Sequence, residues 1–167
     1  MKALTALLLA AAAAPAGLIV AGERIGPAAL GMSPAQLSRA ASTIQCPEAP
    51  AVQALFRDGK AVQLQTNCGG ALLTPAGAQV GALLATALRE FGYPDSTAAS
   101  RVYSFQDGRT ALATWHIYRV GIAFRTVRPT SEPEWRATVT CIAVFRPAAA
   151  PVLGDTCFPQ QPQPEGR

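Results

Sequence analysis

Four cysteines are the residues of this sequence best suited to covalent chemistry: Cys46, Cys68, Cys141 and Cys157. An even number of cysteines in an exported chain is typical of disulfide bonds. Three pairings are open, and we predict Cys46–Cys68 with Cys141–Cys157, because each bond then closes a short loop around local structure. A zinc site needs close-spaced ligand pairs such as Cys-x-x-Cys, which this sequence lacks. We therefore expect disulfides, no metal and no cofactor.

The single histidine, His116, is the other candidate for chemistry. A general base needs a nucleophile or an acid within reach. Serines and an aspartate lie near by in the sequence, but there is no Gly-x-Ser-x-Gly turn of the hydrolase kind. On a strand, His116 is expected to share a face with Tyr103 and Phe105 of the neighbouring strand. We predict a structural histidine and keep a small cell-envelope hydrolase that uses His116 as the alternative.

Arginines outnumber acidic residues between positions 96 and 146, whereas the formal charge of the whole chain is only +4. That charge is too small to indicate nucleic-acid binding. Trp115, Tyr118, Arg119 and Arg125 are of types that dominate protein interfaces when they gather on a surface. We predict that an open sheet face carrying these four residues binds another protein.

The N-terminus has the pattern of a secretory signal peptide. Lys2 precedes an uncharged apolar run over residues 4–14, and small residues follow at Ala14-Pro15-Ala16 and Ile19-Val20-Ala21. Cleavage is expected after Ala16 or Ala21. A membrane anchor would need about 20 apolar residues, and Pro15 and Gly17 interrupt this run. We therefore predict a periplasmic or secreted protein with no stable membrane insertion after cleavage.

Two helix-plus-hairpin patterns can be found in the rest of the chain. Ser33-Pro34-Ala35-Gln36 is typical of a helix start with a capping box, and a hairpin over 52–57 and 60–67 is expected around Asp58-Gly59, a type I′ turn pair. Thr74-Pro75 resembles a second helix start, and apolar residues at helical spacing continue to Gly92, a stop signal. A second hairpin over 101–106 and 109–118 is expected around Asp107-Gly108.

Further strands are expected over 122–127 and 137–145. The repeated order predicts an α+β fold in which two helix-plus-β-hairpin units, related by tandem duplication, form one antiparallel sheet with helices on one face. We expect a signal peptide over 1–21, a single domain over 22–146, and a Pro- and Gln-rich tail over 147–167 that a disulfide at Cys157 staples to the domain.

Three stretches resemble small exported bacterial domains, namely the outer-membrane assembly lipoproteins of the SmpA/OmlA type and the β-lactamase-inhibitor-protein-like fold. They are Ile25-Gly26-Pro27-Ala28-Ala29-Leu30-Gly31-Met32-Ser33-Pro34-Ala35-Gln36-Leu37, Phe91-Gly92-Tyr93-Pro94-Asp95 and Tyr118-Arg119-Val120-Gly121-Ile122-Ala123-Phe124. The resemblance implies a helix layer on a sheet and protein binding without catalysis. The lipoprotein cysteine is absent, and Gly77 stands where the second unit would carry Glu or Gln.

These observations together predict a non-enzymatic binding domain whose partner is an envelope or extracellular protein. Besides the hydrolase, one alternative is a binder of a small apolar ligand between helices and sheet. Such a ligand would require a pocket of several hundred cubic ångströms.

Overall fold

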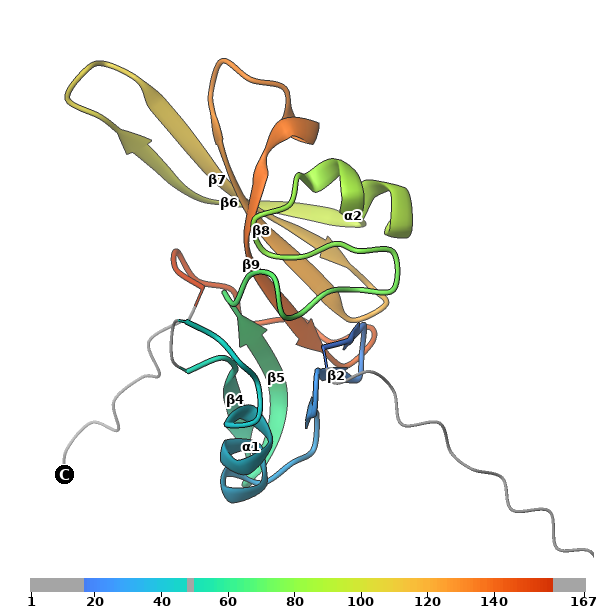
Figure 1. Cartoon of the computed structure of the whole chain (residues 1–167). Coiled ribbons are helices and arrows are strands. Elements are labelled where there is room, and N and C mark those ends of the chain that lie inside the picture. Colours follow the sequence, from blue (N-terminus) through green and yellow to red (C-terminus); the bar gives the residue numbers. More distant parts are fainter. Residues whose placement is uncertain (1–16, 48–49, 158–167) are drawn as a thin grey trace, which may run out of the picture.

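The computed structural model describes residues 17–47 and 50–157 (Figure 1). Six strands form one antiparallel sheet in the order β4-β5-β9-β8-β7-β6, and three two-residue strands form a smaller sheet, β1-β2-β3. The large sheet comprises β4 (Gln53–Arg57), β5 (Lys60–Thr66), β6 (Ser96–Ser104), β7 (Thr110–Tyr118), β8 (Ile122–Pro129) and β9 (Thr138–Phe145). The small sheet comprises β1 (Ile19–Val20), β2 (Arg24–Ile25) and β3 (Ala28–Ala29).

The predicted fold class is wrong. The protein is mostly β, and its described residues form two α-helices of eight residues each, α1 (Pro34–Ala41) and α2 (Leu84–Phe91), with a short 3-10 turn η1 (Glu134–Arg136). The hairpins β4–β5 and β6–β7 lie at opposite edges of a curled sheet, with β9 and β8 between them. Two repeated helix-plus-hairpin units are therefore not present.

The first predicted helix and turn are confirmed in detail. Ser33 caps α1, and the Gln36 side chain bonds back to the Ser33 backbone, which completes the capping box. Asp58 and Gly59 both have positive φ, as a type I′ turn requires. A bulge between Leu55 and Phe56 shifts the register further along this hairpin.

The second helix begins ten residues later than Thr74, its predicted cap. Gly77 and Gly81 have φ values of +90° and +89°, which a right-handed helix cannot contain. The Thr74 hydroxyl instead accepts a hydrogen bond from the Ala78 N–H. The segment 81–84 forms backbone hydrogen bonds with Ala137 and Val139. The predicted stop signal is confirmed, because α2 ends at Phe91 and Gly92 is its C-cap residue.

The second hairpin is displaced by one residue from its predicted register. Phe105 N–H donates to the Arg109 carbonyl, so the loop holds three residues, and Gly108 takes the positive φ that such a loop needs. Tyr103 therefore pairs with Ala111, not Leu112. A one-residue slip exchanges the two faces of a strand, so Tyr103 lies on the face opposite to His116.

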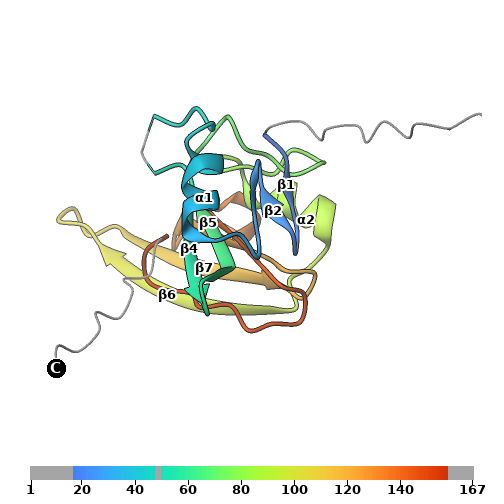
Figure 2. The same ribbon diagram turned by 90° about the horizontal axis from the view of Figure 1, so that it is seen from below.

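The two faces of the large sheet are covered differently (Figure 2). The first face carries the main core, in which Tyr118, Phe124 and Val144 of the sheet join Ile19, Leu37 and Leu84 from the covering layer. The second face carries a smaller cluster formed by Trp115, Ala123, Cys141, Ala143 and Phe145. We call residues 147–157 the strap, because they run across this second face.

Candidate functional site

The strap covers the face on which the sequence predicted an open binding surface. Two of the predicted interface residues, Trp115 and Arg125, lie on this face and are buried, with exposed fractions of 1% and 6%. Tyr118 is buried in the first-face core, so it points to the other side. Only Arg119, in the turn after β7, is exposed. The structure therefore does not bring the four predicted residues together on one accessible surface.

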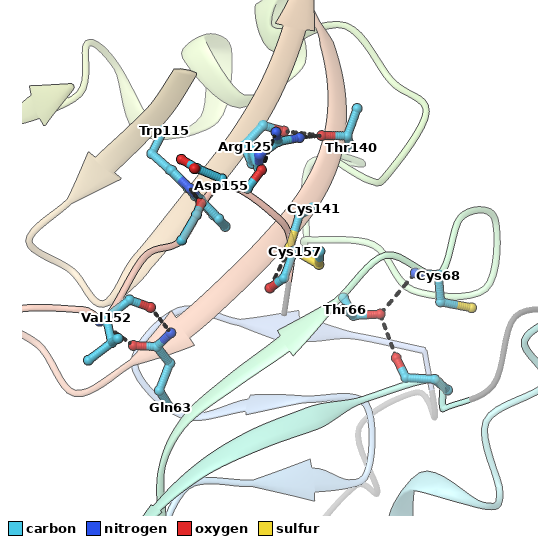
Figure 3. Close-up of a disulfide and its surroundings, with 12 residues drawn as sticks. Gln63, Thr66, Cys68, Trp115, Arg125, Thr140, Cys141, Val152, Asp155 and Cys157 are labelled. Carbon is cyan, nitrogen blue, oxygen red and sulfur yellow. Dashed lines mark hydrogen bonds between the residues drawn. A yellow bond between two sulfur atoms is a disulfide. The ribbon is translucent and has the colours of Figure 1, made fainter. Parts of the chain in front are cut away.

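The sheet binds the strap mainly through the strap's own backbone (Figure 3). The Gln63 amide donates to the Val152 carbonyl at 2.7 Å and accepts from the Val152 N–H at 2.8 Å. Trp115 Nε1 donates to the Gly154 carbonyl at 2.9 Å. Because these bonds reach backbone groups, they fix the course of the strap with little dependence on its side chains.

Arg125, on strand β8, binds the strap through its side chain. One guanidinium nitrogen donates to the Tyr103 hydroxyl and to the Asp155 carbonyl, and the other donates to the Thr140 hydroxyl. All three acceptors are neutral. A buried cation needs such hydrogen bonds to offset its lost hydration. The arginine therefore acts here as a structural residue.

Both predicted disulfides are present in the structure. Cys141–Cys157 ties the end of the strap to β9, and Cys46–Cys68 ties the segment after α1 to the end of β5. Beside the second bond, Thr66 donates to the Ala51 carbonyl and accepts from the Cys68 N–H (Figure 3).

His116 is enclosed in the first-face core, with 1% of its surface exposed. Its Nε2 lies 2.9 Å from the Thr126 hydroxyl, and its Nδ1 lies 3.7 Å from a Glu134 carboxylate oxygen. Burial lowers the pKa of His116 below its usual value, the nearby Glu134 acts in the opposite direction, and Arg128 lowers the pKa further. A substrate could not reach this imidazole without opening the core, which argues against the hydrolase alternative.

An open basic cleft lies beside the strap on the second face. Its cavity of about 420 Å³ is bounded by the β4–β5 hairpin, the end of β9 and the strap. Three exposed cations, Arg57, Lys60 and Arg146, stand around it, with one acid, Asp58. Within the described chain none of these three cations has an ion-pair partner. The cleft is also lined by Leu55, Val62, Gln63, Phe145, Ala149, Ala150 and Val152.

A second hollow of about 620 Å³ is lined by the start of the strap and by Ser96, Ile117 and Arg119. It shares Phe145, Ala149 and Ala150 with the basic cleft. Arg119 lines this hollow, the only one of the four predicted interface residues to do so. Its backbone N–H donates to the Asp95 carboxylate at 2.7 Å, and its guanidinium lies 3.9 Å from the same group. The Arg119 charge is thus already partly balanced.

Sequence reasoning missed the basic cleft for a topological reason. Arg57 and Lys60 flank the first turn, whereas Arg146 follows β9, and only the long-range pairing of β5 with β9 brings them together. The sequence contained part of the signal for this cleft, because Arg57 and Lys60 flank the predicted turn Asp58-Gly59.

A more apolar cavity of about 470 Å³ lies between α1 and the start of β4. Leu37, Ile44, Val52 and Phe56 line it, and Ser38 and Ser42 are among its polar contributors. Its size falls within the usual range for small-molecule sites.

The part of the chain that the structure describes contains no cluster of three or more potential metal ligands. It also contains no helix of sufficient length and apolar character to cross a bilayer. Comparison with known proteins returned no matching family model, no matching curated protein and no matching solved structure. The resemblance to the assembly lipoproteins thus stays a prediction.

Proposed function

We propose that this chain is an exported, periplasmic or secreted domain that binds another protein without catalysing a reaction. Its disulfides support export, because such bonds persist in oxidising compartments and are rare in the cytoplasm. The predicted leader falls largely on residues 1–16, outside the described part of the chain.

The observation that carries the binding proposal is the charge of the basic cleft. The cleft is lined by three cations without ion-pair partners and by the apolar residues Val62 and Phe145. Asp58 is the single acidic residue among the lining residues. Charge complementarity selects partners and speeds their association. The partner that fits is an acidic segment of an envelope or extracellular protein that also carries an apolar side chain to contact the apolar residues of the cleft.

Charge reversal tests this proposal. The triple variant Arg57→Glu, Lys60→Glu, Arg146→Glu changes exposed residues only, so the circular dichroism spectrum should stay native. Crosslinked capture of acidic proteins from the native envelope should fall at least about tenfold, since loss of several complementary charges costs more than 1.4 kcal/mol.

A matched control carries Arg39→Glu, Arg101→Glu and Arg136→Glu, which reverse the same number of exposed charges elsewhere. The control should capture the same proteins as the wild type. Equal capture by both triple variants would refute a role for the cleft.

The cavity beside α1 supports one alternative, the binding of a small apolar ligand. Native mass spectrometry with dodecanoate as the probe would detect such binding. Ala41→Trp should abolish it by filling the cavity that Ala41 lines. Failure of the wild-type protein to retain dodecanoate would remove this alternative.

A further inference from the structure

We propose that the leader is cut between Ala16 and Gly17, so that the mature chain begins at Gly17 and keeps strand β1. This inference rests on the proposed export of the chain. The sequence left two cleavage points open, and the structure of residues 17–26 distinguishes them, because a cut after Ala21 would remove part of the folded domain.

The side chain of Ile19 belongs to the main core. It is fully buried, with an exposed fraction of 0%, among the residues of the first face. Its N–H donates to the Leu73 carbonyl at 2.7 Å, and the Leu73 N–H donates in turn to the Gly17 carbonyl at 2.9 Å. A chain beginning at Gly22 would lose this side chain and both hydrogen bonds.

Strand β1 also completes the small sheet. Ile19 pairs with Ile25 and Val20 pairs with Arg24, while the Gly26 N–H donates to the Leu18 carbonyl at 2.9 Å. Ile25 is itself fully buried. Without residues 17–21, β2 would keep only its two-residue pairing with β3, and an apolar void would open beside Ile25.

The sequence around the two points agrees with the structure. Signal peptides end in an Ala-x-Ala-like pattern of small residues. Ala14-Pro15-Ala16 has a small residue at both positions of that pattern, whereas Ile19-Val20-Ala21 places the branched Ile19 at the first of them.

The reaction is hydrolysis of one amide bond by the exporting cell's leader-removing protease. The bond between the Ala16 carbonyl carbon and the Gly17 nitrogen breaks, and water supplies the hydroxyl to Ala16 and the proton to the new Gly17 amine. Proteases act on accessible, locally unfolded chain. Because Ile19 is only three residues beyond Ala16, β1 must take its place in the core after the cut.

The intact mass of the exported protein tests the inference. The full-length chain is produced in a bacterium that exports it, and the envelope fraction is analysed without reduction. We expect a chain beginning at Gly17. A chain beginning at Gly22 in that fraction would overturn the inference and leave export standing, whereas an uncut Met1 chain retained in the cytoplasm would overturn both.

A substitution gives an independent readout. Ile19→Asn in the full-length exported protein should lower the urea concentration at the unfolding midpoint, because a polar side chain replaces an apolar one in the core. Asparagine is used because alanine at position 19 would itself complete an Ala-x-Ala pattern before Gly22. Val20→Asn, at a partly exposed neighbour, should lower the midpoint less. Wild-type midpoints for both variants would mean that the mature chain lacks β1.

Discussion

Two buried polar side chains that the sequence analysis considered both have structural roles: Arg125, which was predicted to lie in an interface, and His116, which was predicted to be structural with a hydrolase as the alternative. Arg125 binds the strap, and His116 lies beside Glu134 of η1 with the Thr126 hydroxyl as its hydrogen-bond partner. At His116 the core favours the neutral imidazole, because burial lowers the pKa of the histidine. A histidine held in this way makes stability depend on pH.

The expected dependence follows from proton uptake. The unfolded chain binds a proton at His116 near the ordinary pKa of about 6.5, whereas the folded chain does so only at lower pH. Stability from this residue is therefore complete above that pH and is lost as the pH falls towards the folded-state pKa. The charged groups that influence this site are Glu134 and Arg128.

We predict that His116→Gln reduces the loss of stability between pH 7 and pH 5. Glutamine keeps a hydrogen-bonding group near Thr126 but does not titrate. The measurement is the free energy of unfolding in urea at both pH values for wild type and variant. An equal loss in the two proteins would show that His116 is not the titrating group.

At the scale of elements, the strap is the segment whose role can be isolated. Its disulfide should contribute about 2–4 kcal/mol to stability, and it covers Trp115. We predict that Cys141→Ala with Cys157→Ala lowers stability by about that amount and shifts Trp115 emission to longer wavelength. The measurement uses a Trp135→Phe background, because Trp135 is exposed and would obscure the change.

The control for the strap is Cys46→Ala with Cys68→Ala, which removes the other disulfide. It should reduce stability similarly but leave Trp115 emission unchanged. If emission also stays unchanged without Cys141–Cys157, then the hydrogen bonds of Gln63 and Arg125 suffice to hold the strap.

The sequence predicted elements where a local signal was sufficient. The capping box at Ser33, the turn at Asp58-Gly59 and both short-range disulfides are of this kind. The sequence-based prediction failed where one turn sequence is compatible with two loop lengths. Asp107-Gly108 suits a two-residue or a three-residue loop, and the choice decided on which face Tyr103 lies. The strap was foreseen only as a tail, because its hydrogen bonds reach Gln63 and Trp115, which are distant in sequence.

At the scale of the whole molecule, Gly121 joins three distant segments. Its carbonyl accepts from the N–H groups of both Gly22 and Phe145. Its φ is +94°, and a Cβ there would overlap the Phe145 carbonyl oxygen and the Gly22 backbone. The N-terminal layer, the β7–β8 turn and the end of β9 thus meet at a point with no room for a side chain.

We predict that Gly121→Ala destabilises the protein by about 3 kcal/mol or more, because backbone strain and steric overlap add. Gly77→Ala is the matched control. Gly77 also has positive φ but has open space around it, so only the strain of about 1–2 kcal/mol remains. Urea unfolding of both variants gives the comparison, and equal losses would mean that the crowding at Gly121 relaxes easily.

Because β9 lies between β5 and β8 in the large sheet, the protein cannot be divided into two parts that fold independently. A tandem repeat could be cut at its midpoint into halves that each keep a folding unit. Here β9, the last strand of the described residues, joins the β4–β5 hairpin to β8 of the three strands β6, β7 and β8, so a nonsense mutation before Thr138 would leave β5 and β8 with unpaired edges and no common core. Such edges recruit other chains. Premature termination should therefore yield aggregates or degraded polypeptide, never a shorter working protein, and fragments of this gene cannot complement one another as independent domains.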